Sequence, residues 1–247
     1  MPLSPVRLEK VFRYAIFFDG VDDVAVVPYS PLLDITDNLT VLAFFMTIAP
    51  IPDQKIVSKY PGVPQWVIGV YNSRAYTELW TAGGGYSSQN YIGTFRLGRW
   101  HQYGISYRSS DGYYTVYLDG ERAGTISTDG WPLRSSTGNT VIGSSTDTNG
   151  LHLLGLVSQV LVYARVLSDD EVMWNYNNFE DPVSGSLRLS LFAHPDNVSD
   201  IDNDGILEWI DLSGHGNHGK LYGARLITLI KDPARVLTSA RALTPAR

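Results

Sequence analysis

The sequence predicts an all-β protein, a two-sheet antiparallel jelly-roll sandwich with one short helix and a C-terminal extension. Roughly a dozen runs rich in β-branched and aromatic residues follow one another at hairpin spacing. Asp-Gly pairs, which supply the positive-φ residue of a tight turn, separate several of these runs, as at Asp19-Gly20, Asp111-Gly112 and Asp119-Gly120. With 247 residues, of which 44% are hydrophobic and 18% charged, the chain can bury a large core.

The first predicted elements are a strand, a turn and a second strand. Residues 14–18 and 24–27 flank the Asp19-Gly20 turn, and residues 39–48 form a long run that is apolar on both faces at its centre. Pro50 and Pro52 end this run, because proline donates no hydrogen bond to a sheet ladder. Further strands are expected at 55–59, 65–71, 77–81, 90–95, 100–107, 113–118, 122–126, 140–143 and 151–163.

One helix is predicted directly after Ser168. Ser168 is a favourable N-cap residue, and Glu171 follows it at the spacing of a capping box. Asp169 and Asp170 lie where the helix dipole is positive. The helix is expected to end before Asp181-Pro182, which closes a domain at residues 14–182 behind an N-terminal arm at residues 1–13.

Four strings in this region occur in a familiar order. They are Phe18-Asp19-Gly20-Val21-Asp22-Asp23, Trp100-His101, Val116-Tyr117-Leu118-Asp119-Gly120, and the stretch from Val162 to Val172. In this order they make the chain resemble the laminin-G-like members of the concanavalin A-like lectin-glucanase superfamily. The resemblance implies a β-sandwich whose usual role is binding rather than catalysis, although a fold alone does not fix a function.

The strand pattern restarts after Gly185. Leu187, Leu189 and Leu191 alternate with polar residues, which predicts a half-buried strand. Residues 211–219 are similar to a string found near the start of laminin-G-like repeats. Residues 183–224 are therefore predicted to be the opening of a second, incomplete repeat. Since part of a sandwich cannot bury its own apolar face, it must pack on the first domain or on another subunit.

Residues 225–247 are predicted to be a basic, extended arm. Five basic residues stand against one aspartate there, a net charge of +4, which leaves −10 for the rest of a chain whose total is −6. A six-residue repeat puts Arg235, Arg241 and Arg247 on one face of an extended strand. We expect this arm to contact the sheet edge of a neighbouring subunit, with a frayed tail as the alternative.

Residues 200–211 have the spacing of a calcium-binding loop, which makes calcium the expected cofactor. The expected ligands are Asp200, Asp202, Asp204, Ile206 through its carbonyl, Glu208 and Asp211. Gly205 permits the sharp turn that such a loop makes. A solvated acidic turn is the alternative.

Glycan binding requires aromatic platforms with polar neighbours. The expected ligand-binding aromatic residues are Trp66, Tyr71, Trp80, Tyr86 and Tyr91, with Tyr76 on the same strands. Gly83–Gly85 would allow a ligand to approach closely. About half of these rings are expected to face the core, because side chains alternate across a strand.

Other classes of function are disfavoured. The sequence has no cysteine, which excludes disulfides and thiolate chemistry, and its net charge of −6 argues against nucleic acid. Neither a signal peptide nor a membrane-inserting segment is visible. No nucleophile elbow, phosphate loop or zinc-protease motif occurs, and the strands lack the closely spaced carboxylates of sandwich glucanases, so an enzyme is not predicted.

Two functions remain. The first is a non-enzymatic structural and assembly protein, displayed on a virion as capsid, decoration or fibre, or on a surface lattice. Its arm would contact copies of itself or other structural proteins. The second is a calcium-dependent carbohydrate-binding or adhesion module that takes surface glycans. Both place the protein on a virion or an extracellular surface.

Overall fold

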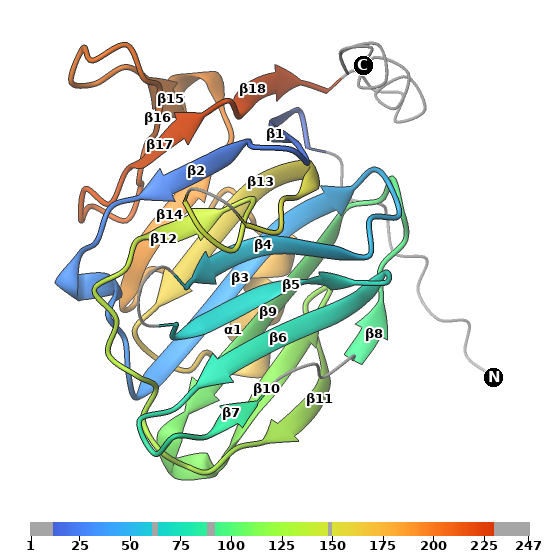
Figure 1. The fold of residues 1–247 in the computed structure, drawn as a ribbon, viewed down its shortest axis with the longest axis vertical. Coiled ribbons are helices and arrows are strands. Elements are labelled where there is room, and N and C mark those ends of the chain that lie inside the picture. The colour runs from blue at the N-terminus through green and yellow to red at the C-terminus, as the bar shows by residue number, and fades with distance from the viewer. Residues whose placement is uncertain (1–11, 61–63, 88–91, 148–149, 230–247) are drawn as a thin grey trace.

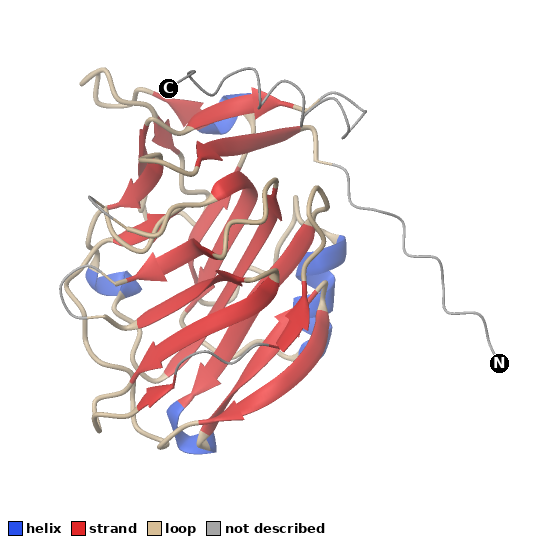
Figure 2. Cartoon of the chain, turned by 45° about the vertical axis from the view of Figure 1, so that its right-hand side comes forward, coloured by secondary structure: helices blue, strands red, loops and turns tan. Residues whose placement is uncertain are grey.

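The computed structural model describes residues 12–60, 64–87, 92–147 and 150–229, and these residues form two antiparallel sheets packed face to face (Figures 1 and 2). The predicted fold class, an antiparallel two-sheet sandwich, is therefore confirmed. Side chains alternate across each pleat, so one face of every long strand contributes to the core between the sheets.

Sheet A contains eight strands in the order β11-β10-β9-β3-β13-β1-β18, with β14 paired to the second half of β13. Their bounds are β1 Tyr14–Asp19, β3 Asn38–Thr47, β9 His101–Arg108, β10 Tyr113–Leu118, β11 Glu121–Ser127, β13 Leu154–Tyr163, β14 Leu187–Phe192 and β18 Arg225–Thr228. The sheet thus joins segments from both ends of the described chain.

Sheet B contains ten strands in the order β15-β16-β17-β2-β12-β4-β5-β6-β7, with β8 also paired to β6. Their bounds are β2 Val24–Val27, β4 Asp53–Lys59, β5 Trp66–Tyr71, β6 Arg74–Trp80, β7 Tyr86–Ser87, β8 Ile92–Thr94, β12 Thr140–Ile142, β15 Val198–Ser199, β16 Glu208–Trp209 and β17 Gly219–Tyr222. Strand β6 begins three residues earlier than predicted, because Asn72 and Ser73 take positive φ angles and close a tight hairpin.

The core lies between the two sheets. Ile16 and Tyr103 enter it from sheet A, and Trp66, Ile68 and Trp209 enter it from sheet B. All five are at most 1% exposed. Burial of such large side chains is the main stabilising contribution to a sandwich of this size.

Helix α1, Asp169–Asn177, lies on the outer face of sheet A, behind the sandwich in Figure 1. The predicted capping box is present: the Ser168 hydroxyl accepts the amide of Glu171, and the Glu171 carboxylate accepts the amide of Ser168. Val172 packs the helix against Leu161 and Tyr163 of β13. Three single-turn 3-10 helices, η1 Pro31–Leu33, η2 Ser109–Asp111 and η3 Pro195–Asn197, complete the described helices.

The C-terminal segment extends both sheets of the same sandwich. Strand β14 pairs with β13, β17 with β2, and β18 with β1. Its apolar side chains, among them Leu189, Leu191 and Trp209, enter the common core. The segment therefore packs on its own chain. The proposed division into domains stays a prediction, and Arg235, Arg241 and Arg247 of the arm lie outside the described residues.

Candidate metal and ligand sites

The aspartate loop, residues 200–208, joins β15 to β16 and is shaped by its own carboxylates. Asp200 accepts hydrogen bonds from the amides of Asp204 (3.1 Å) and Gly205 (3.0 Å), and Asp204 accepts one from the amide of Ile206 (2.8 Å). Asn203 and Gly205 adopt positive φ angles of 60° and 86°. The backbone therefore coils around the acidic side chains, as the calcium-loop spacing predicts.

Three carboxylates of this loop converge. Oxygen atoms of Asp200, Asp202 and Glu208 all lie within 4.8 Å of one another, and the Glu208 side chain is almost fully buried. Lys220 of β17 reaches the same place: its Nζ is 2.8 Å from Asp202, contacts Asp204 and is 3.6 Å from Glu208. Its hydrogen bonds to Asp202 and Asp204 raise the pKa of Lys220. An all-oxygen donor set of this kind fits a hard cation, and here the ammonium group offsets part of its negative charge.

Asp211 does not join this group. Its two carboxylate oxygens accept the amides of Ser190, Ser213 and Asn217 (2.9 Å each) and the hydroxyl of Ser213 (2.7 Å). These bonds hold the turn at residues 211–217 against β14. The structure thus brings together Asp200, Asp202 and Glu208 of the predicted ligands and links Asp204 to them through Lys220. Ile206 lies on the same loop, and Asp211 has a role in the turn.

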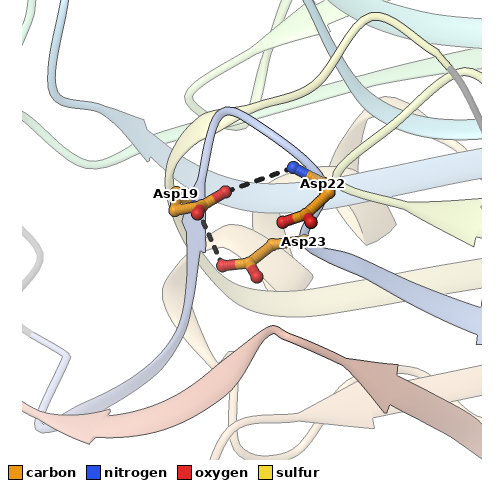
Figure 3. Close-up of side chains that lie close together, drawn as sticks. All are labelled: Asp19, Asp22 and Asp23. Carbon is orange, nitrogen blue, oxygen red and sulfur yellow. Dashed lines mark hydrogen bonds between the residues drawn. The ribbon is translucent and has the colours of Figure 1, made fainter. Parts of the chain in front are cut away.

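A second acidic cluster occupies the turn between β1 and β2 (Figure 3). Asp19 accepts the amides of Val21 (2.8 Å) and Asp22 (3.4 Å), and Asp23 accepts the amide of Asp19 (2.9 Å). Burial, and then the nearby charge of Asp19, raises the pKa of Asp23 to about 6. Sequence analysis predicted only a turn at these residues, although three carboxylates within five positions could have indicated a metal site.

The predicted aromatic residues are placed differently from one another. Trp66 is 1% exposed and lies in the core, because it alternates inward with Ile68 on β5. Tyr71 and Trp80 are half-buried on the outer face of sheet B, where Trp80 packs edge-on against Tyr60 with ring centroids 5.4 Å apart. Tyr86 belongs to β7 by its backbone, and Tyr91 lies outside the described residues.

An exposed aromatic residue that sequence reasoning did not propose as a ligand site is Trp131, between β11 and β12. Its side chain is 56% exposed, and a Cβ atom on Gly83 would come within 2.6 Å of its ring. Asp129 fixes the loop by accepting the Trp131 amide (3.2 Å) and the Thr81 hydroxyl (2.6 Å). The indole ring therefore packs against the backbone of Gly83, which has no side chain, and the rest of the ring is exposed to solvent. The glycines at 83–85 were the available signal.

Within the described residues, no helix combines the length and the apolar character needed to cross a bilayer.

The comparisons with known proteins agree with this architecture. A family model described as the concanavalin A-like lectin/glucanases superfamily matches residues 19–173. The match covers the region that carries the four strings noted above. No curated protein sequence matches the chain.

Three solved structures illustrate the similarity in fold. A candidate carbohydrate binding protein from Bacteroides ovatus ATCC 8483 is 17% identical with a TM-score of 0.65, and the match covers 90% of this chain and 61% of that one. A heptameric SAP-like pentraxin from Limulus polyphemus is 20% identical with a TM-score of 0.52, covering 66% and 82%. A sialidase carbohydrate-binding domain from Ruminococcus gnavus, bound to sialyllactose, is 16% identical with a TM-score of 0.50, covering 67% and 96%. At these identities the likeness shows the fold.

Proposed function

Since the chain belongs to the concanavalin A-like lectin/glucanases superfamily, we propose that it is a non-enzymatic carbohydrate-binding module. Trp131 is the observation that carries the proposal. A sugar ring binds through its apolar face to an exposed aromatic ring and through its hydroxyl groups to polar side chains nearby. Trp131 offers such a ring, packed against Gly83, and the carboxylate of Asp129 accepts the Trp131 backbone amide two residues away.

Two fold neighbours support this assignment of class. Carbohydrate binding is the role assigned to the Bacteroides ovatus protein, and sialyllactose is bound by the Ruminococcus gnavus domain. These ligands are assigned to those two proteins and not to this chain. This chain covers 61% of the length of the Bacteroides ovatus protein. A glycan ligand for this chain is our proposal, and it would suit display on an extracellular surface.

We further propose that calcium binds in the aspartate loop. The ligands would be the carboxylates of Asp200, Asp202, Asp204 and Glu208 with the carbonyl of Ile206. Lys220 competes for the same oxygens, because its ammonium group contacts Asp202 and Asp204. When bound, the ion would supply positive charge that holds the loop rigid. The C-terminal segment would then be more rigid next to the sandwich that carries the proposed glycan surface at Trp131.

The glycan assignment is tested by binding the full chain to an array of oligosaccharides, with and without a chelator. We expect W131A to lose binding and G83A to weaken it, since an alanine Cβ would displace the indole. W174A is the matched control, because Trp174 is 48% exposed on α1. An array with no signal would contradict the proposed function, and glycan binding that is unchanged in W131A would remove Trp131 from it.

Assembly into a virion or surface lattice is a second candidate, and one observation favours it. Among the described strands, β18, formed by the first residues of the predicted arm, lies at the edge of sheet A and pairs on one side with β1, and residues 230–247 of the arm follow it in the sequence. An unpaired strand edge is a natural template for a neighbouring chain. The partners would be copies of the protein or other structural proteins.

A further inference from the structure

A polar groove of about 400 Å³ lies on the outer face of sheet A, beside the start of α1. It runs over β9, β10 and β11 and is bounded on one side by residues 166–170, which lead into the helix. This surface is separate from the aspartate loop, which belongs to the far edge of sheet B.

The floor of the groove follows from strand alternation. Ser106 of β9 and Thr115 of β10 are paired in register and point outward, since Ile105 and Val116 enter the core. A hydrogen bond of 2.7 Å between the hydroxyls of Ser106 and Thr40 fixes the floor. The floor is therefore polar and rigid rather than apolar.

One end of the groove carries an aromatic ring. Tyr113, two residues from Thr115 along β10, is 39% exposed, and Arg108 is its cross-strand partner. Arg108 is 3.6 Å from Asp111. This end adjoins the loop of Trp131, because the amide of Thr128 donates to the carbonyl of Gly112 at 2.8 Å.

The other end is built around Asp169. Its carboxylate accepts the hydroxyl of Tyr117 (2.9 Å) and pairs with Arg122 (3.2 Å). Asp170 adds a further carboxylate to the lining. Both arginines of the groove are thus paired with aspartates, and the acidic first turn of α1 offsets the positive end of the helix dipole.

The charges of the groove favour a neutral ligand over an anionic one. An anion would meet three carboxylates and two guanidinium groups whose charge is already neutralised. A neutral ligand rich in hydroxyl groups would find carboxylate acceptors, guanidinium donors and a tyrosine ring within one groove. We infer that the groove binds an uncharged oligosaccharide, with one sugar ring against Tyr113. The inference rests on the proposed function and deepens it by naming the ligand class and a second contact surface.

The test titrates the full chain with neutral probes, namely the hexaoses of glucose and N-acetylglucosamine, and with sialyllactose and a heparin hexasaccharide as anionic probes. We expect a neutral probe to bind with little dependence on salt. Y113A should weaken it about tenfold, the value of one aromatic contact, whereas Y113F should bind normally. Melting temperatures report whether each variant folds.

A second readout needs no substitution. In amide NMR spectra the neutral probe should shift the signals of Arg108, Thr115 and Asp170. Binding of anionic probes alone, unchanged affinity in Y113A, or shifts elsewhere would overturn the inference. If glycans bind through Trp131 and not through Tyr113, the proposed function stands and the groove assignment falls. If no glycan binds anywhere, both fall.

Discussion

Lys59 shows how strongly burial in this fold perturbs a single charged group. Its side chain is fully buried, and its ammonium group donates to the carbonyl of Gly138 at 2.8 Å, with the Tyr29 ring 5.5 Å away. Burial lowers the pKa of Lys59 to about 8, and the charge of Asp34 opposes the shift. Between about pH 8 and pH 10.5 the unfolded chain therefore holds a proton that the folded protein does not.

Stability should consequently rise with pH in that window. The unfolded state binds more protons there, so the free energy of unfolding increases as the pH rises. Relative to K59M, which has no such proton, the wild-type protein should gain up to about 3 kcal/mol between pH 8 and 10.5. Urea unfolding at several pH values measures the difference. K220M serves as the control, because the folded-state pKa of Lys220 is raised and does not fall in this window. A constant difference between wild type and K59M would refute the buried-charge account.

At the scale of elements, the aspartate loop depends on a competition between Lys220 and a cation. If calcium binds the folded loop alone, saturating it a hundredfold above the dissociation constant adds about 2.7 kcal/mol to the free energy of unfolding. We expect calcium to raise the melting temperature and D202N to abolish that increase. K220M should be less stable than wild type without calcium, since it leaves the carboxylates unpaired, and should gain more from calcium. D22N, in the β1–β2 turn, tests whether the second acidic cluster contributes.

Two outcomes would contradict a calcium site in the aspartate loop. A melting temperature that is unchanged by calcium and by chelator in both wild type and K220M would leave the loop as an acidic turn whose carboxylates are partly paired with Lys220. An increase that survives D202N and disappears in D22N would move the ion to the β1–β2 turn.

Local sequence signals predicted those elements whose structure is determined locally. The Asp-Gly turns and the Ser168–Glu171 capping box depend on backbone angles and hydrogen bonds within a few residues, and the structure confirms them. The hairpin of β5 and β6 was expected from the spacing of its strands, but its turn at Asn72-Ser73 and the early start of β6 were not, because the turn has no glycine. Its central residues take positive φ angles in an arrangement that favours the tight turn between β5 and β6.

Site residues were harder to predict, because their placement depends on distant parts of the chain. Spacing alone put Asp211 among the calcium ligands, but contacts with Ser190 and Asn217 direct its carboxylate into a turn. Trp66 faces the core through strand alternation, which fixes two faces but does not say which is outside. Trp131 is a candidate ligand-binding residue because its ring packs against Gly83, a contact between residues far apart in the sequence that the sequence does not reveal.

At the scale of the whole molecule, the two sheets are completed by both ends of the described chain. Residues 14–182 alone would leave one edge of β1 and one edge of β2 unpaired. Strands β18 and β17 cover these edges. A segment that resembles the start of a second repeat therefore completes the sandwich. Its strands pair with edges that would otherwise be unpaired, and its leucines pack into the common core.

With β18 in place, the edge of sheet A among the described strands is β18, and a test of assembly starts there. We expect the full chain to form oligomers at high concentration if residues 230–247 pair with a neighbour's edge. A chain ending at residue 229 keeps β18 and should remain monomeric with the same melting temperature. R235E/R241E/R247E, in the full-length chain, separates charge from strand pairing: loss of oligomers would assign the contact to the arginines, because the rest of the chain carries a net charge of about −10. Sedimentation velocity measures all three. Monomers throughout, or identical oligomers in the full and truncated chains, would exclude the arm from assembly and leave glycan binding as the sole proposed role.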